Sequence, residues 1–156
     1  MIDVTIGQNA PDFCLPIDDE HSLTLSSLKG KSIILYFYPK DDTSGCTAQA
    51  VAFSNQKHAF DEVGAVIIGV SKDTLKSHTK FRQKYDLTII LASDHSTQVS
   101  ENYGVWVKKS MYGRKYMGME RATFLIDPSG VVSHTWRKVK VAGHVEDVLR
   151  VMQKPS

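Results

Sequence analysis

Runs of apolar residues bounded by turn residues predict the strands of this chain. The clearest run covers 33–38, and it is β-branched and aromatic without a polar interruption. This pattern is typical of a strand whose sheet is covered on both faces. Similar runs predict four more strands, at 65–70, 88–91, 122–126 and 131–136. An Asp-Pro-Ser-Gly turn at 127–130 joins the last two, so we expect them to form an antiparallel hairpin.

Apolar residues spaced three and four apart predict the helices between these strands. We expect a long helix over 47–63, with Gly64 as its C-terminal cap. A second helix is expected over 73–85, where Asp73 is a suitable N-cap. The remaining helical patterns cover 96–103 and 143–152.

The order of these elements predicts the fold class. Strand–helix–strand units imply right-handed parallel crossovers, and the terminal hairpin adds antiparallel strands. We therefore expect an α/β protein with a central mixed β-sheet and helices on both faces, for which a thioredoxin-like topology is the leading candidate. No repeat, low-complexity tract or linker divides the 156 residues, so we treat 1–156 as a single domain.

Composition and charge narrow the classes of function. The sequence is 42% hydrophobic and 23% charged, which is typical of a globular domain. Nineteen basic and seventeen acidic residues leave a net charge of +2, too small to indicate a nucleic-acid or membrane-surface protein. No apolar run approaches the ~20 residues of a membrane-spanning helix, and the first residues lack the pattern of a secretory signal. A cytoplasmic location is therefore expected.

The cysteines are the first candidates for chemistry. Cys14 and Cys46 are the only two, which excludes a disulfide scaffold. Cys46 follows the loop after the first long strand and lies where a helix is expected to begin. Unpaired N–H groups and the positive end of the helix dipole favour a thiolate at that position. We interpret Cys46 as a nucleophile, although a lone cysteine is more often a small buried apolar residue.

Two neighbours of Cys46 support this interpretation. Thr43 lies three residues earlier, so its hydroxyl can reach the same pocket, and it can also cap the helix. Gly45 lets the backbone approach a small ligand closely, or it simply serves the turn. The six histidines show no metal-ligand spacing, and no acidic cluster has the pattern of a calcium loop. We expect no metal and no cofactor.

The loop around Cys46 resembles that of a known family. Segment 36–47, with the sequence Tyr-Phe-Tyr-Pro-Lys-Asp-Asp-Thr-Ser-Gly-Cys-Thr, is similar to the active-site loop of peroxiredoxins, in particular the bacterioferritin comigratory protein (peroxiredoxin Q) subfamily. Four further segments resemble the family in the same order, at 10–16, 69–73, 112–118 and 120–127. The resemblance spans nearly the whole chain. It implies a thioredoxin-like fold and a thiol-dependent peroxidase that reduces hydrogen peroxide and organic hydroperoxides.

The resemblance also implies roles for individual residues. Cys46 would be the peroxidatic cysteine, whose thiolate attacks the peroxide and becomes a sulfenic acid. Thr43 and Arg121 would complete the site as donors aimed at the peroxide oxygens. Without the resemblance, we would interpret Arg121 as a member of a surface ion pair. Three further residues would support the site. Pro39 would shield the thiolate from water, Gly45 would donate a backbone N–H, and Gln49 would orient the arginine.

The sequence departs from the family at the second thiol. Many members carry a resolving cysteine five residues after the first, but here that residue is Val51, and 73–85 contains no cysteine. Cys14 is the only candidate, and we interpret it as structural. We therefore expect a one-cysteine mechanism in which an external thiol (thioredoxin, glutaredoxin or glutathione) recycles the enzyme. An atypical two-cysteine mechanism using Cys14 is the alternative. Ser44 replaces the usual proline, which should loosen the loop.

Other functions compete with a peroxidase. A thiol–disulfide oxidoreductase normally needs Cys-x-x-Cys, which is absent here. A redox-sensing or holdase module could keep the same fold, with Cys46 as the sensor. The basic and aromatic segment 107–116 can suggest binding of single-stranded nucleic acid, but we expect a solvated loop. The expected partners are a peroxide and an external thiol, with neither nucleic acid nor membrane, and we expect a monomer or weak dimer.

Overall fold

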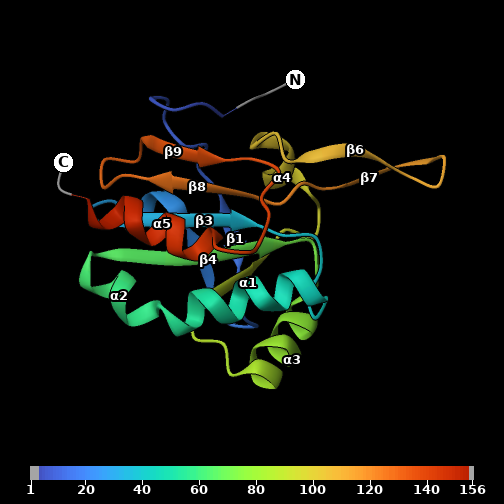
Figure 1. The fold of residues 1–156 in the computed structure, drawn as a ribbon, viewed down its shortest axis with the longest axis horizontal. Coiled ribbons are helices and arrows are strands. Elements are labelled where there is room, and N and C mark those ends of the chain that lie inside the picture. Colours follow the sequence, from blue (N-terminus) through green and yellow to red (C-terminus); the bar gives the residue numbers. More distant parts are fainter. Residues whose placement is uncertain (1–3, 155–156) are drawn as a thin grey trace.

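The structure, a computed structural model that describes residues 4–154, is built around one mixed sheet (Figure 1). Its five strands have the order β5-β4-β3-β8-β9. They are β3 (Ser32–Phe37), β4 (Ala65–Ser71), β5 (Ile90–Ser93), β8 (Ala122–Ile126) and β9 (Val132–Trp136). The first three are parallel to one another, and β8 and β9 pair antiparallel. The α/β class, the mixed sheet and the hairpin at its end are confirmed.

The central strand β3 divides the core into two layers. Its side chains alternate, so that Leu35 and Phe37 join one buried cluster, and Ile34 and Tyr36 join the other. All of these side chains are almost completely buried. A strand covered on both faces explains the uninterrupted apolar run in the sequence.

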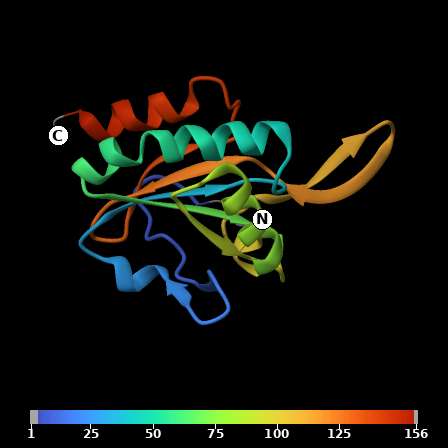
Figure 2. The same ribbon diagram turned by 90° about the horizontal axis from the view of Figure 1, so that it is seen from below.

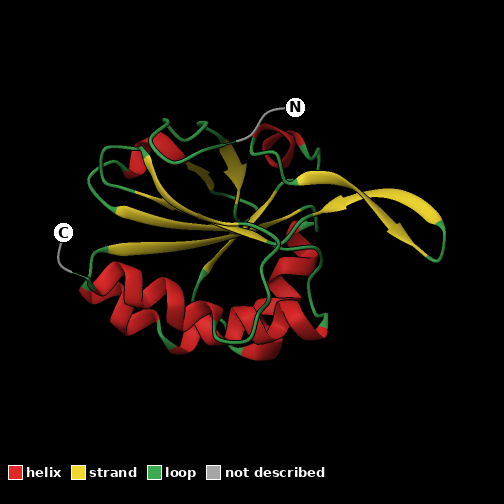
Figure 3. Ribbon diagram, turned by 45° about the horizontal axis from the view of Figure 1, so that its top comes forward, coloured by secondary structure: helices red, strands yellow, loops and turns green. Residues whose placement is uncertain are grey.

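Helices lie on both faces of the sheet, but unequally (Figure 3). One face carries the longer helices α1 (Ser44–Asn55), α2 (Lys57–Glu62), α3 (Leu75–Tyr85) and α5 (His144–Gln153). The other face carries α4 (Gln98–Asn102), the 3₁₀ helix η1 (Leu25–Leu28) and a small hairpin of β1 (Cys14–Pro16) and β2 (Ser22–Thr24). Both faces of the sheet are therefore shielded, as the sequence pattern indicates.

Two helix predictions need correction. The helix expected over 47–63 is two helices, because Gln56 leaves the helical conformation (φ −98°, ψ 5°) between α1 and α2. The N-cap of α3 is Thr74 and not Asp73, since the Thr74 hydroxyl oxygen accepts the N–H of Ser77 at 3.2 Å. The Asp73 carboxylate instead accepts one hydrogen bond from the backbone N–H of Asp41, in the loop before α1, and one from the hydroxyl of Ser71. The strand expected over 88–91 lies two residues later, as β5.

The segment expected to be a solvated loop, 107–116, is instead part of a further hairpin. Strands β6 (Trp106–Met111) and β7 (Arg114–Met119) pair antiparallel along their whole length. The hairpin extends away from the sheet, and β7 leads directly into β8 (Figure 2). Its turn residues Tyr112 and Gly113 both have positive φ, at 52° and 77°, as a two-residue hairpin turn requires. Most side chains near its tip are exposed, so solvation is the correct part of the expectation.

Within residues 4–154, no helix is both long enough and apolar enough to cross a membrane. That residues 1–156 form a single domain stays a prediction.

Candidate active site

Cys46 lies in the first turn of α1, directly after the loop that follows β3. The first backbone bond of the helix, from the N–H of Thr47 to the carbonyl of Thr43, is 2.8 Å long. Cys46 is only 2% exposed and packs in the same buried cluster as Tyr36 and Phe53. The sulfur is therefore placed at the positive end of a helix and is largely removed from water. The position predicted from the sequence is confirmed.

Arg121 reaches Cys46 because of the sheet register. Residue 121 immediately precedes β8, whose first residue Ala122 pairs with Phe37 at the end of β3. The active-site loop begins just beyond Phe37, so the two segments meet at the same edge of the sheet. Odd-numbered positions such as Leu125 face the cluster that contains Cys46. The alternation of a strand thus places Arg121 on the side of the thiol.

The guanidinium of Arg121 joins the thiol to a buried amide. Its Nη2 donates to Cys46 Sγ at 3.3 Å, and its Nη1 donates to Gln49 Oε1 at 2.7 Å. Gln49 is completely buried and lies three residues after Cys46, so both side chains are on one face of α1. The planar fork is held at two points, which fixes the direction in which the remaining N–H groups are aimed.

Gly45 leaves the space that the guanidinium occupies. A Cβ atom at this position would lie 3.2 Å from Arg121 Nη2 and 3.9 Å from its Cζ. Such a contact is tighter than ordinary packing, so any side chain here would push the guanidinium away from the sulfur. The glycine is needed for close approach of the backbone to the site, and its own turn geometry does not require it.

Thr43 and Pro39 lie on the solvent side of the loop. Thr43 is exposed and occupies the N-cap position, but its hydroxyl donates to the carbonyl oxygen of Lys40 at 2.9 Å and not to the helix or to the sulfur. Pro39 is half-buried, one residue beyond Tyr38. The roles of Thr43 as a donor to peroxide and of Pro39 as a shield stay predictions.

A buried polar cluster fixes the loop, and sequence reasoning missed it. Asp41 accepts hydrogen bonds from the hydroxyls of Tyr38 and Ser77, at 2.6 and 2.8 Å. Its Oδ2 lies 2.7 Å from Nδ1 of His78, and Nε2 of the same ring lies 3.1 Å from the carbonyl of Ala92. Both ring nitrogens therefore face an oxygen acceptor, and the imidazole is fixed between Asp41 and the backbone of Ala92. The available signal was a histidine on the apolar face of the predicted helix 73–85.

Further contacts hold the same loop to its surroundings. The backbone N–H of Asp41 donates to Asp73 Oδ2 at 2.9 Å. On the surface, Asp42 accepts from Lys84 Nζ at 2.7 Å and from the hydroxyl of Tyr85 at 2.5 Å. The hydrogen bond from Lys84, followed by that from Tyr85, lowers the pKa of Asp42. The loop before Cys46 is therefore held to α3 at consecutive residues.

Cys14 lies on the other side of the central sheet from Cys46. It is exposed on β1, and its neighbours Phe13 and Leu15 pack in the cluster on the other face of the sheet from Cys46. Both cysteines are free thiols. A bond between them within one chain would need the backbone to move, because the central sheet lies between the two clusters.

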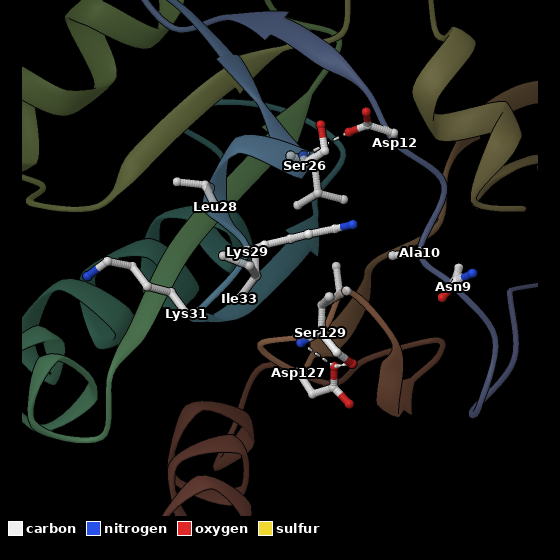
Figure 4. A pocket seen from close by; sticks show the side chains of 13 residues that line it. Asn9, Ala10, Asp12, Ser26, Leu28, Lys29, Lys31, Ile33, Asp127 and Ser129 are labelled. Carbon is white, nitrogen blue, oxygen red and sulfur yellow. Dashed lines mark hydrogen bonds between the residues drawn. The ribbon is translucent and has the colours of Figure 1, made fainter.

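A pocket of about 270 Å³ lies elsewhere, between η1 and the turn that joins β8 and β9 (Figure 4). Lys29 extends across it, with Asp12 and Ser26 on one side and Asp127 on the other. None of the residues around Cys46 lines it. Among residues 4–154, no group of three or more His, Cys, Asp or Glu side chains is placed to hold a metal ion.

Comparison with known proteins shows the family to which the chain belongs. A family model described as "AhpC/TSA family" matches residues 6–135. The chain belongs to this family. Among curated AhpC/TSA relatives, a "Putative peroxiredoxin bcp" of Coxiella burnetii is 51% identical over 146 residues, which cover 94% of this chain and 97% of the relative. "Peroxiredoxin Bcp" of Bacillus subtilis is 46% identical over 153 residues, 98% of each chain. The resemblance to Bcp-type peroxiredoxins is confirmed.

Solved structures of AhpC/TSA proteins share the fold. A cysteine-to-serine variant of Xylella fastidiosa PrxQ has a TM-score of 0.92 and 34% identity, covering 98% of both chains. The Xanthomonas campestris bacterioferritin comigratory protein, described for its alkyl peroxide reduction activity, has a TM-score of 0.86 and 40% identity over 90% of both chains. The thioredoxin-like fold expected from the sequence is confirmed.

Proposed function

We propose that this protein reduces hydrogen peroxide and organic hydroperoxides with Cys46 as the attacking thiolate. The observation that carries the proposal is the contact of Arg121 with the Cys46 sulfur, held in place by Gln49. The sulfur attacks the terminal oxygen of the peroxide, the O–O bond breaks, and the leaving oxygen takes a proton to become water or an alcohol. Cys46 is left as a sulfenic acid.

The arrangement supports this reaction by its fixed donors. Negative charge moves from the sulfur onto the two peroxide oxygens as the bond breaks. Arg121 and the backbone N–H groups at the start of α1 are aimed at that region before the peroxide arrives, which lowers the barrier. Gly45 keeps the space open for the guanidinium, and Pro39 shields one side of the thiolate. We assign Thr43 to the peroxide-facing side of the loop, where its oxygen can contact the substrate.

We further propose that an external thiol returns the sulfenic acid to the thiol. One thiol condenses with the sulfenic acid and releases water, and a second thiol then displaces Cys46 from the mixed disulfide. The opposite placement of Cys14 and Cys46 relative to the sheet supports this one-cysteine route over an internal disulfide. Thioredoxin, glutaredoxin and glutathione are the candidate donors. We expect neither nucleic acid nor membrane among the partners, and a monomer or weak dimer.

The first experiment follows peroxide consumption with dithiothreitol as the thiol. Wild type and Cys14→Ser are expected to turn over, and Cys46→Ser is expected to be inactive. Mass spectrometry of peroxide-treated protein without reductant should detect a sulfenic acid on Cys46 and no link to Cys14. Turnover that persists in Cys46→Ser would refute the proposed function, and an internal Cys14–Cys46 bond required for turnover would refute the one-cysteine route.

A further inference from the structure

The segment that joins β9 to α5 holds the main chain of Arg121. This connecting segment, residues 137–143, crosses the end of the sheet at which β8 begins (Figure 1). The last pair of the β8–β9 ladder is Thr123 with Trp136, so Arg121 lies two residues beyond the paired region. Beyond the ladder, the N–H of Val139 donates to the carbonyl oxygen of Arg121 at 2.9 Å. The connecting segment therefore fixes the main chain from which the guanidinium extends.

Arg137 fixes the start of the connecting segment. Its Nε donates to Glu120 Oε2 at 2.6 Å, and its Nη2 donates to the carbonyl oxygen of Gly104 at 2.9 Å. The same Glu120 oxygen accepts the backbone N–H of Lys138 at 3.3 Å. The side chains of Glu120 and Arg137 are 12% and 32% exposed, so water and salt screen these charged hydrogen bonds only weakly. One side chain thus joins three segments at the residue before Arg121.

The backbone of the connecting segment is strained where these bonds hold it. Lys138 has φ 48°, in the left-handed region that residues with a Cβ adopt rarely and at a cost. Its own N–H donates to Glu120, and the next N–H, of Val139, donates to Arg121. A strained residue persists only where the surrounding contacts determine its conformation, and such strain indicates a constraint from function.

The connecting segment also contacts the surroundings of the thiol. Val141 Cγ2 lies 3.9 Å from the position that a Cβ on Gly45 would occupy, and Arg121 Nη2 lies 3.2 Å from the same position. The Val141 side chain and the guanidinium therefore pack beside the same glycine, one residue before Cys46. A shift of the connecting segment would move the main chain of Arg121 and, at the same time, a neighbour of its guanidinium.

Arg121 is thus held at both ends of its side chain. Gln49 accepts from Nη1 at the tip, and the connecting segment holds the main chain. The distance of 3.3 Å from Nη2 to the Cys46 sulfur depends on both. Because a small displacement at a remote contact is transmitted to the reacting atoms, loosening the main-chain end should lower the reactivity of the site.

We propose that Arg137 is a positioning residue for the peroxide reaction. Through Glu120 it holds the connecting segment against the main chain of Arg121, and so keeps the guanidinium on the Cys46 sulfur. It acts through Arg121, which carries the donors to the reacting atoms. This inference rests on the proposed peroxidase function and adds a residue to that same site.

The test measures the second-order rate constant with which hydrogen peroxide oxidises the reduced protein in one turnover, without a recycling thiol. All proteins carry Cys14→Ser, so Cys46 is the only thiol. Arg137→Met should lower this rate constant about tenfold, the scale of a lost charged hydrogen bond. Arg137→Lys, which can keep the ion pair, should recover a large part of the rate. The matched control Arg150→Met, which breaks an exposed ion pair on α5, should react like the parent protein.

A second background separates positioning from a general loosening of the fold. In Arg121→Met the guanidinium is gone, so adding Arg137→Met should change the rate constant by less than about twofold. A general loosening of the fold would instead lower the rate in both backgrounds. Urea unfolding checks that each variant is folded under the assay conditions. If Arg137→Met is not, Glu120→Gln replaces it under the same criteria, since the amide keeps an acceptor but removes the charge.

The outcomes distinguish this inference from the function on which it rests. A parent-like rate in Arg137→Met, an equal loss in Arg150→Met, or an equal loss in both backgrounds would overturn the positioning role. If peroxide does not oxidise Cys46 in the parent protein, the proposed function fails instead.

Discussion

The loop before Cys46 is held by the buried carboxyl group of Asp41, which lies within hydrogen-bond distance of three side chains, so replacing Asp41 should loosen the loop. Asp41 is 6% exposed and His78 is 1% exposed. In Asp41→Asn a single amide oxygen must serve the hydroxyls of Tyr38 and Ser77 and the ring nitrogen of His78. Leaving a buried polar group without its partner typically costs about 1–3 kcal/mol. Because the asparagine keeps one acceptor for these three groups, we expect a total of about 3 kcal/mol.

The adjacent residue provides the control. Asp42→Asn makes the same chemical change, but Asp42 lies on the surface, where its partner Lys84 is also exposed. Asp42 has φ 60°, in the left-handed region, which asparagine tolerates well. Its replacement should therefore leave the free energy of unfolding close to the wild-type value. Urea unfolding measures both variants, and the slope of the transition should stay constant.

A second assay measures whether the contacts of Asp41 control access to Cys46. Cys46 is buried, so a bulky thiol reagent reacts with it only when the loop opens. In a Cys14→Ser background, where Cys46 is the only thiol, Asp41→Asn should accelerate labelling by about a hundredfold if the full 3 kcal/mol acts on local opening. The reasoning is refuted if Asp41→Asn costs less than about 1 kcal/mol, or if it destabilises no more than Asp42→Asn.

Three further predictions concern the site and its surroundings. Gln49→Leu removes the acceptor from Arg121 and should reduce kcat/KM for peroxide by about ten- to a hundredfold, the scale of a charged hydrogen bond; Gln49→Glu should retain more activity. Gly45→Ala should displace the guanidinium and lower kcat/KM without a comparable loss of unfolding free energy; equal kcat/KM for this variant and wild type would contradict that role. Burial lowers the pKa of His144 from 6.5 to about 4, so the unfolded chain takes up a proton first as pH falls. Urea unfolding should therefore detect a loss of about 2 kcal/mol between pH about 6.5 and about 4, and His144→Gln should remove most of it.

The sequence predicts those parts of the fold in which local pattern and tertiary environment agree. The continuous apolar run of β3 needs two covered faces, and the fold supplies them. The break at Gln56 has no such signal, because the spacing of apolar residues continues across it, and the contact of α2 with β4 forms only in the folded chain. The hairpin of β6 and β7 was missed because neither strand is buried, so its side chains do not alternate between apolar and polar.

The residues of the candidate site likewise differ in how far the sequence predicts their positions. Cys46 and Gln49 are one turn apart on a helix, so their proximity follows from local sequence. Arg121 is 75 residues from Cys46, and only the antiparallel pairing of β8 with β3 brings it close. A slip of one residue in that pairing would exchange the two faces of β8 and turn the guanidinium away from the thiol. The position of Arg121 beside Cys46 therefore depends on how β8 packs, and its residues Phe124 and Leu125 are both buried. Substitutions in the core beneath β8 should therefore displace the Arg121 guanidinium more than they displace the Cys46 sulfur.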